Sequence, residues 1–382
     1  AYLRVGGNAS GANGTLNIGG GTVNANYVVV ARGTAVNTVT GAINMTDGAF
    51  NLSNLALADT GTGQGGGAGG TASLNVSGGT MTISSWAFLG NSGAVGVPTA
   101  TFSLSGTGVI NASGDFAAGR YSNVTSTQTG GNLNILGTAR LFVGALSSST
   151  STYDLSGTGA IGISSASQNG HGLYLGAFGA TSTFSLDGGT LTTPQVTAGT
   201  GSETFNFNGG TLVANKDNSS FMTALTAANV ENGGAIIDDG GFDITIGQAL
   251  LNGGSGGLTK KGAGTLTLTG ASTYVGRTDV VAGTLTVNGG ALSGGGLIDI
   301  GATGGPDANF ALVDGSVTAG SQFVVGAHGV DSLATMDAGT LQVNGPMYLG
   351  GYGEGTGTGT FTQSGGTNTV TAAVNFGGNG PN

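Results

Sequence analysis

The sequence predicts an all-β fold, a β-solenoid with about 13 or more irregular coils of 20–31 residues. Of the 382 residues, 82 are glycine, 38% are hydrophobic and 7% are charged. Such a chain is too apolar to be disordered, and its glycines supply the backbone angles of many tight turns. A motif of alternating apolar residues that closes on glycine recurs along the chain, and stacked copies bury their apolar faces against one another.

The repeat is read from the first apolar residue of each copy of the motif. Up to Phe205, successive copies are 20 to 31 residues apart, which is the length of one coil of a parallel β-solenoid. A β-propeller blade needs about 40 residues and is therefore excluded. The copies begin at Leu16, Ile43, Leu74, Phe102, Leu133, Tyr153, Phe184, Phe205, Leu266, Leu285, Phe310, Leu333 and Phe361.

A second motif, apolar-x-apolar-Gly, follows the first in most coils. Its two apolar residues are expected to point inward, so the residue between them points outward. Many outward residues are then aromatic, which predicts a face that contacts a sugar or a protein. The alternative is that these rings stack on each other and stiffen the coil. Two positions before the middle residue, further copies carry an aromatic residue that we also expect to point outward. The predicted contact face consists of Phe88, Phe142, Tyr174 and Tyr348 in the middle of the motif, and of Tyr2, Tyr27 and Trp86 two positions earlier.

Two further features interrupt the repeat. The segment that follows the second motif varies in length from coil to coil. This predicts loops on one side of the solenoid at 61–70, 93–99, 123–131 and 353–359. The pattern breaks over residues 218–233, which predicts a short helix there that is capped by Ser219 or Ser220 and buries Phe221, Leu225 and Ala228. We therefore predict one continuous solenoid over 1–382, with glycine-rich coils at 1–213, a lateral excursion with that helix at 214–256, a distinct repeat at 257–290 and further coils at 291–382.

Residues 257–290 read GLTKKGAGTLTLTGASTYVGRTDVVAGTLTVNGG. They closely resemble the passenger-associated transport repeat, also called the autotransporter-associated β-strand repeat, of bacterial autotransporter passengers. The departures are Ser272, Val275 and Arg277, and none of them disturbs an inward position. The resemblance implies a right-handed parallel β-helix on a bacterial surface, exported through a C-terminal outer-membrane barrel. The chain ends NFGGNGPN, so we expect either an excerpt of a longer protein or another export route.

Composition excludes several kinds of site. The chain has no cysteine, so a disulfide or a thiolate metal site is ruled out. A net charge of −10 argues against nucleic acid as a partner, because its binding needs a basic surface. No apolar run approaches the length of about 20 residues that a membrane helix requires. We expect no cofactor.

The remaining chemical motifs each have a simpler interpretation. Asp238, Asp239 and Asp243 form a weak calcium candidate, but the GGxGxD repeats of calcium-binding β-rolls are absent and a solvated acidic turn is favoured. The dinucleotide-type glycines at 61–66 lack the strand and helix of a phosphate loop. His171 and His328 are expected to be solvated turn residues.

An enzymatic site has one candidate, with Lys260 or Lys261 as base beside the three aspartates. The 26 charged residues are scattered through many turns, so we predict that the protein is not an enzyme.

The sequence thus predicts a non-enzymatic extracellular solenoid of a bacterial surface, a stalk, adhesin or fibre with one-sided loops for contact. An alternative is a filament subunit, because both chain ends fall on the second motif and head-to-tail stacking would pair their backbones. A second alternative is a glycan-binding or glycan-cleaving β-helix. The predicted partners are copies of the chain, a host surface, a neighbouring cell or a glycan.

Overall fold

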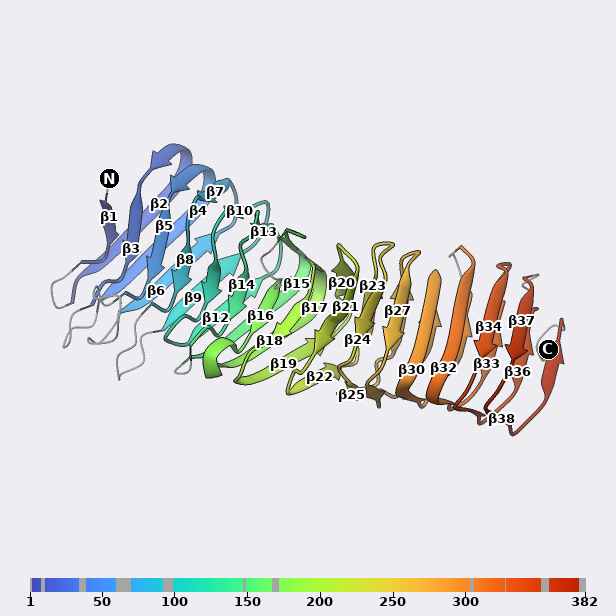
Figure 1. Ribbon diagram of the computed structural model, residues 1–382. Helices are drawn as coiled ribbons and strands as arrows, with labels where there is room; N and C mark the ends of the chain where they lie inside the picture. Colours follow the sequence, from blue (N-terminus) through green and yellow to red (C-terminus); the bar gives the residue numbers. More distant parts are fainter. Residues whose placement is uncertain are drawn as a thin grey trace. The chain divides into compact units, whose positions relative to one another are not determined.

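The computed structural model describes residues 2–7, 11–33, 39–59, 70–91, 99–146, 149–166, 172–302, 306–326, 328–351 and 357–377. They form strands β1 to β39 and a single 3-10 turn, η2 (Ala177–Gly179). The strands pair in parallel with their counterparts in the next turn of chain, as in β6 with β9 and β27 with β30 (Figure 1). The predicted all-β solenoid is confirmed. The chain divides into two compact units, Ala1–Phe205 and Asn206–Asn382, called unit 1 and unit 2.

A turn of unit 1 has three strand segments separated by corners. One example consists of β6 (Thr71–Val76), β7 (Thr80–Ile83) and β8 (Ala87–Leu89), and these pair with β9 (Ala100–Leu104), β10 (Val109–Ala112) and β11 (Phe116–Ala118). The other strands of unit 1 are β1 (Tyr2–Val5), β2 (Asn13–Asn24), β3 (Tyr27–Val30), β4 (Thr40–Leu52), β5 (Asn54–Leu57), β12 (Val124–Gln128), β13 (Asn132–Ile135), β14 (Leu141–Val143), β15 (Thr150–Ile163), β16 (Leu173–Leu175), β17 (Thr181–Thr193) and β18 (Val196–Ala198).

Unit 2 repeats the same arrangement, and β19 (Ser202–Phe207) contains the boundary between the units. In its opening turns, β20 (Thr211–Ala214), β21 (Asn218–Thr223), β22 (Ala227–Val230), β23 (Ala235–Asp238), β24 (Ile244–Ile246), β25 (Leu250–Asn252) and β26 (Leu258–Lys261) are short. They are followed by β27 (Thr265–Leu268), β28 (Ala271–Ser272), β29 (Thr278–Val280), β30 (Gly283–Gly294), β31 (Ile298–Ile300), β32 (Ala308–Ala319) and β33 (Phe323–Val325). The last strands are β34 (Ser332–Met336), β35 (Thr340–Val343), β36 (Met347–Leu349), β37 (Gly359–Gln363), β38 (Thr367–Val370) and β39 (Val374–Phe376).

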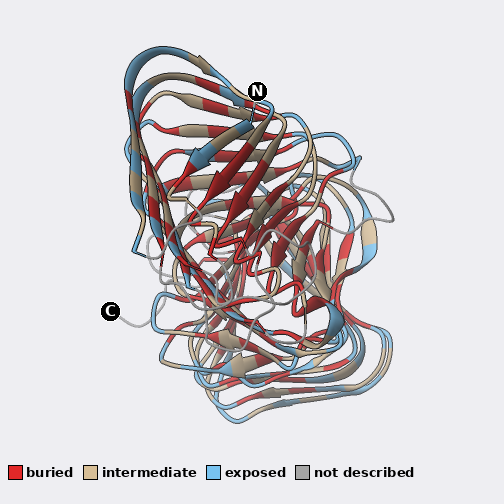
Figure 2. Cartoon of the chain, turned by 90° about the vertical axis from the view of Figure 1, so that its left-hand side faces the viewer, coloured by how far each residue is buried: buried red, intermediate tan, exposed pale blue. Residues whose placement is uncertain are grey.

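The core of each unit is formed by every second strand residue, because side chains alternate between the two faces of a strand. Figure 2 shows buried residues alternating with partly exposed ones along the strands. In unit 2, Leu266 lies opposite Leu285 and Leu268 opposite Val287, and all four are at most 1% exposed. The two alternating runs that defined the motif are therefore neighbours in the core, as predicted.

The corner after the second motif requires a left-handed backbone. Gly90 and Gly144 have φ values of 66° and 70°, which suit glycine because it has no Cβ. At the equivalent corners of β3 and β5, Ala31 and Ala58 take φ values of 52° and 53°. An alanine in this region is strained, so glycine is the residue that the corner favours.

The prediction of a short helix within residues 218–233 is wrong. Residues 218–223 and 227–230 form β21 and β22, which pair with β24 and β25. Ala224 separates them with a φ of 63°, a value that ends an α-helix. Phe221, Leu225 and Ala228 are buried as expected, but two strands and a turn place them there.

The predicted first residue of the motif is also wrong in two coils, at Leu133 and Leu333. Tyr153 pairs with Ser126 of β12, whereas Leu133 belongs to the next segment. The proposed insertion at 123–131 is thus largely strand, which the pattern hid because its inward residues are the polar Ser126 and Gln128. Near the C-terminus Ala334 pairs with Phe310, and Leu333 is 39% exposed.

Candidate functional site

Aromatic side chains form a continuous surface on β1, β3 and β8 of unit 1 and on the residue before β8. These strands belong to one sheet (Figure 1). The rings of Tyr2 and Tyr27 are stacked with centroids 5.3 Å apart. Trp86 meets the edge of Tyr27 at 5.5 Å and stacks on Phe88 at 4.3 Å. These four residues, which we call the aromatic face, are brought together from three different turns of chain.

All four basic residues of unit 1 lie against aromatic rings of this sheet. The Arg4 guanidinium lies 5.1 Å from the Tyr2 ring centre, and Arg120 lies 4.1 Å from that of Phe88. Arg32 Nη1 donates to the Tyr2 hydroxyl at 3.0 Å, and Arg140 lies 4.8 Å from the Phe142 ring centre. Cation–π contacts of this kind orient a guanidinium without neutralising its charge.

One carboxylate accompanies the arginines near Tyr27. Asp59 is 5% exposed and accepts a hydrogen bond from Asn91, whose amide oxygen in turn accepts from Arg120 at 3.0 Å. Burial raises the pKa of the Tyr27 phenol, Asp59 adds to the rise, and Arg32 and Arg120 oppose it. The three charged groups therefore act on the same ring and form one electrostatic patch.

The predicted contact face is only partly exposed. Tyr2 is 52% exposed, and Tyr27, Trp86, Phe88 and Tyr174 are half-buried. Phe142 and Tyr348 are 7% and 4% exposed, so the expectation that they are open to a partner is wrong. Both do point away from the coil, but Phe142 is packed among Ala117, Ala145, Ala177 and neighbouring rings, and Tyr348 packs with Val324 and Leu297 of unit 2.

Arg32 and Arg120 were missed because only the register of the turns brings them to Tyr2 and Phe88. Arg4 and Arg140 lie two residues from the rings that they contact, Tyr2 and Phe142. The sequence held a signal, however. Arg32 and Arg120 each follow a corner residue directly, and Arg4 lies in the middle of a second motif.

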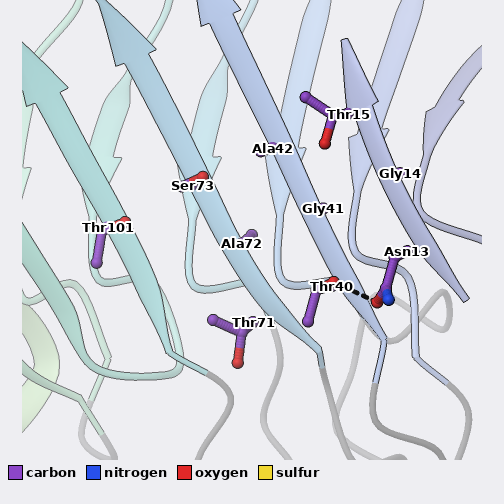
Figure 3. A pocket seen from close by; sticks show the side chains of 10 residues that line it. All are labelled: Asn13, Gly14, Thr15, Thr40, Gly41, Ala42, Thr71, Ala72, Ser73 and Thr101. Atoms are coloured by element: carbon purple, nitrogen blue, oxygen red, sulfur yellow. Dashed lines mark hydrogen bonds between the residues drawn. The ribbon is translucent and has the colours of Figure 1, made fainter. Parts of the chain in front are cut away.

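A different face of unit 1 presents hydroxyl and amide groups. Figure 3 shows its shallow pocket on β2, β4, β6 and β9, lined mainly by Thr15, Thr40, Thr71, Ser73 and neighbouring residues. Beside it, Asn44 donates to Asn17 at 2.9 Å and Asn75 donates to Asn44 at 2.8 Å. These amides bond to one another from turn to turn, so this ladder stabilises the coil.

A buried ion pair lies inside unit 2. Lys260 and Asp239 form a salt bridge with both side chains 0% exposed. The Lys260 amine also donates to the carbonyl oxygens of Gly262 at 2.8 Å, Ala282 at 2.9 Å and Lys261 at 3.1 Å. Because every neighbour of the amine is an acceptor, the group is held here as an ammonium.

The other carboxylate oxygen of Asp239 accepts from the backbone of Gly241 at 2.8 Å and of Gly264 at 2.9 Å. The pair therefore joins three successive turns of chain, those that contain Asp239, Lys260 and Ala282. A second buried contact follows on the same stretch, where the Tyr274 hydroxyl and the Thr278 hydroxyl lie 2.7 Å apart.

Residues 258–293 match the family model described as Passenger-associated-transport-repeat. The chain carries a passenger-associated transport repeat. Lys260, Tyr274 and Thr278 all belong to this transport repeat, and the resemblance predicted from residues 257–290 is confirmed. The repeat and the parallel coils around it fit an autotransporter passenger repeat protein. The searches for similar curated proteins and for similar solved structures found no match.

Lys260 does not suit the role of a base that the sequence suggested for it. Burial lowers the pKa of the Lys260 amine, with Asp239 opposing the shift, but the side chain is 0% exposed and so is closed to a substrate in solution. Asp239 is occupied by Lys260 and two backbone amides, while Asp238 and Asp243 accept from the backbone of Gly240 and Thr265. Within the described part of the chain, no three His, Asp or Glu side chains are placed to hold a metal ion.

Arg277 of the transport repeat belongs to a second charged cluster. It forms salt bridges to Asp279 at 2.6 Å and to Asp299 at 3.1 Å, and His328 lies 3.4 Å from Asp299. His328 is thus more than a solvated turn residue, and it takes a left-handed φ of 61°. Burial raises the pKa of Asp299, His328 and Arg277 oppose the rise, and Asp279 adds to it.

This cluster predicts a pH effect on stability. Since the folded state raises the pKa of Asp299, it holds that proton more tightly than the unfolded chain. The free energy of unfolding should therefore fall as pH rises from the ordinary aspartate pKa through the raised one. Asp299→Asn should remove this contribution. The measurement is urea unfolding of both proteins from about pH 3.5 to about pH 7.

The matched control is Asp314→Asn, which replaces an exposed carboxylate of the same unit. As pH rises, the unaltered protein should lose stability relative to Asp299→Asn. The stability difference between the unaltered protein and Asp314→Asn should stay constant. Parallel curves for all three proteins would contradict the role given to Asp299.

Two sequence predictions fall outside the residues that the structure describes, namely the glycines at 61–66 and His171. The same holds for most of the expected loops at 61–70, 93–99 and 353–359. In the described ranges, no helix is long and apolar enough to cross a membrane. The continuous solenoid over 1–382 and the filament role stay predictions.

Proposed function

We propose that the chain is a non-enzymatic, extracellular solenoid of a bacterial cell surface, and that unit 1 makes adhesive contact through the aromatic face. The transport repeat supports the passenger-like role and the location. One observation carries the adhesive part: exposed and half-buried rings gather on one sheet with every basic residue of unit 1. Aromatic rings and arginines are the residues that dominate binding energy at interfaces.

The location is tested on the full-length gene product in its own cells. An antibody to the chain should label intact cells, and protease added outside should remove the label. A signal that appears only after lysis would contradict an extracellular role. The control is a cytoplasmic marker, which should stay protected in the same cells.

The adhesive contact is tested by coating beads with the chain and measuring their attachment under flow to the producing bacterium and to host cells. Trp86→Ala should reduce attachment strongly, because it removes the ring that links Tyr27 to Phe88. Phe178→Ala is the matched control, since Phe178 is 71% exposed and contributes no ring to the aromatic face. Equal loss in both variants, or none in either, would contradict the proposal.

A further inference from the structure

The charge distribution of unit 1 indicates what the aromatic face contacts. The whole chain carries 8 basic and 18 acidic residues, so positive charge is scarce. Unit 1 nevertheless places its four arginines, Arg4, Arg32, Arg120 and Arg140, on the sheet that carries the aromatic rings. A local positive surface on an acidic protein is complementary to an anionic partner.

Part of this positive charge is available to a partner. Arg140 is paired with Asp115 at 2.6 Å, but within the described residues no carboxylate forms a salt bridge with Arg4 or Arg120. Asp59, which acts on Tyr27 together with Arg120, is buried under its hydrogen bond from Asn91. The exposed edge of the patch is therefore positive.

The rings supply the second part of the recognition surface. Tyr2 and Tyr27 are nearly parallel, with 8° between their planes, and Trp86 and Phe88 are separated by 14°. The two flat stacks lie on either side of β5, which pairs with both β3 and β8. They offer apolar surface to the faces of sugar rings, and their hydroxyl and indole groups bond at the edges. Arginine beside such a ring recognises carboxylate, sulfate or phosphate groups.

We propose that the aromatic face binds an anionic polysaccharide, with sugar rings stacked on Tyr2, Tyr27 and Trp86 and acidic groups bound by Arg4, Arg32 and Arg120. This inference rests on the proposed adhesive function and names its partner. A polysaccharide fits better than nucleic acid, because three guanidinium groups are few for the one charge per about 1.7 Å of duplex DNA. The net charge of −10 also disfavours so dense a polyanion.

The test measures binding of the purified chain to immobilised polygalacturonate, κ-carrageenan, dextran and single-stranded poly(dT). We expect binding to the first two, weakened by added salt, and none to dextran or poly(dT). Polygalacturonate carries only carboxylates and κ-carrageenan only sulfates, so a preference between them tells which group is recognised. Equal binding to dextran, or binding to poly(dT) alone, would overturn the proposal.

Variants locate the site on the protein. Trp86→Ala and Arg120→Gln should each weaken binding about tenfold, because each removes a stacking or charge-assisted contact. Lys216→Gln, which removes a positive charge from unit 2, and Phe178→Ala should bind as the unaltered chain does. Circular dichroism spectra and melting temperatures show that each variant is folded. Unchanged binding by both Trp86→Ala and Arg120→Gln would overturn the assignment of the binding site to the aromatic face.

Failure of this inference is distinguishable from failure of the adhesive function. If Trp86→Ala abolishes bead attachment while no anionic polysaccharide binds, the face is adhesive but its partner is different. If the polysaccharides bind at the patch but attachment is unaffected by Trp86→Ala, the face is a glycan site and attachment uses another surface.

Discussion

Replacing Lys260 with methionine is expected to lower the free energy of unfolding by about 3–5 kcal/mol. The substitution leaves the Asp239 carboxylate at 0% exposure without its cation, and a buried unpaired charge is strongly destabilising. Three backbone carbonyls, two of the same turn and one of the next, lose their donor at the same time. Urea unfolding followed by far-UV circular dichroism measures the change.

Two further variants show whether charge is the cause. Lys260→Met combined with Asp239→Leu removes both charges and should be more stable than Lys260→Met alone. Lys261→Met, which changes the half-buried neighbour, should alter stability by less than about 0.5 kcal/mol. A double variant that is no more stable than the single one would show that packing, and not the ion pair, governs this site.

Replacing Phe184 with alanine is expected to cost about 3–5 kcal/mol of unfolding free energy. Phe184 is 0% exposed and stacks between Tyr153 and Phe205, with centroids 5.4 and 5.3 Å away. Alanine would leave a cavity between three successive turns, which the stacked rings on either side cannot close without losing their own contacts. Thermal and urea unfolding both report the loss.

The control for this position is Phe178→Ala, which removes a ring that is 71% exposed and should change stability by less than about 0.5 kcal/mol. Phe184→Leu, which fills much of the cavity, should lose clearly less than Phe184→Ala. If Phe184→Ala cost less than about 1 kcal/mol, the stack would not be a main element of the core.

The sequence predicted the coils well wherever inward residues are apolar. Leu266 and Leu285 were identified as equivalent because a strand with one buried face has a period of two. The same rule failed at Ser126 and Gln128, which point inward although they are polar. Gln128 is satisfied there by the Tyr153 hydroxyl at 2.7 Å and by the carbonyl oxygens of Gly131 and Ala160. Such partners arise only when the turns are stacked, so the pattern cannot reveal them.

The alternation of inward and outward residues along the strands also indicates the buried ion pair. Lys260 has the same parity as Leu258 on its strand, which places it inward, and it pairs in register with Ile237. Asp239 follows Ile237 at the next inward position. Alternation alone therefore directs both charges into the core, although lysine and aspartate are rarely buried unless they are paired.

The aromatic face was only partly predicted from the alternation of inward and outward residues. The second motif placed Phe142 and Tyr348 on the side of the strand that faces away from the core. It could not show that other side chains cover them, because these belong to neighbouring turns and corners.

The three-turn span of the Lys260 contacts has a consequence for how this region folds. Each strand pairs with a neighbour only one turn away along the chain, so the contacts are of short sequence range and the coils can form one after another. Asp239 meets Lys260 when the second of these turns is in place, but the carbonyl of Ala282 reaches the ammonium only with the third. The desolvated charges are fully coordinated only once that third turn has docked, which makes its arrival the step that commits the region to its native alignment.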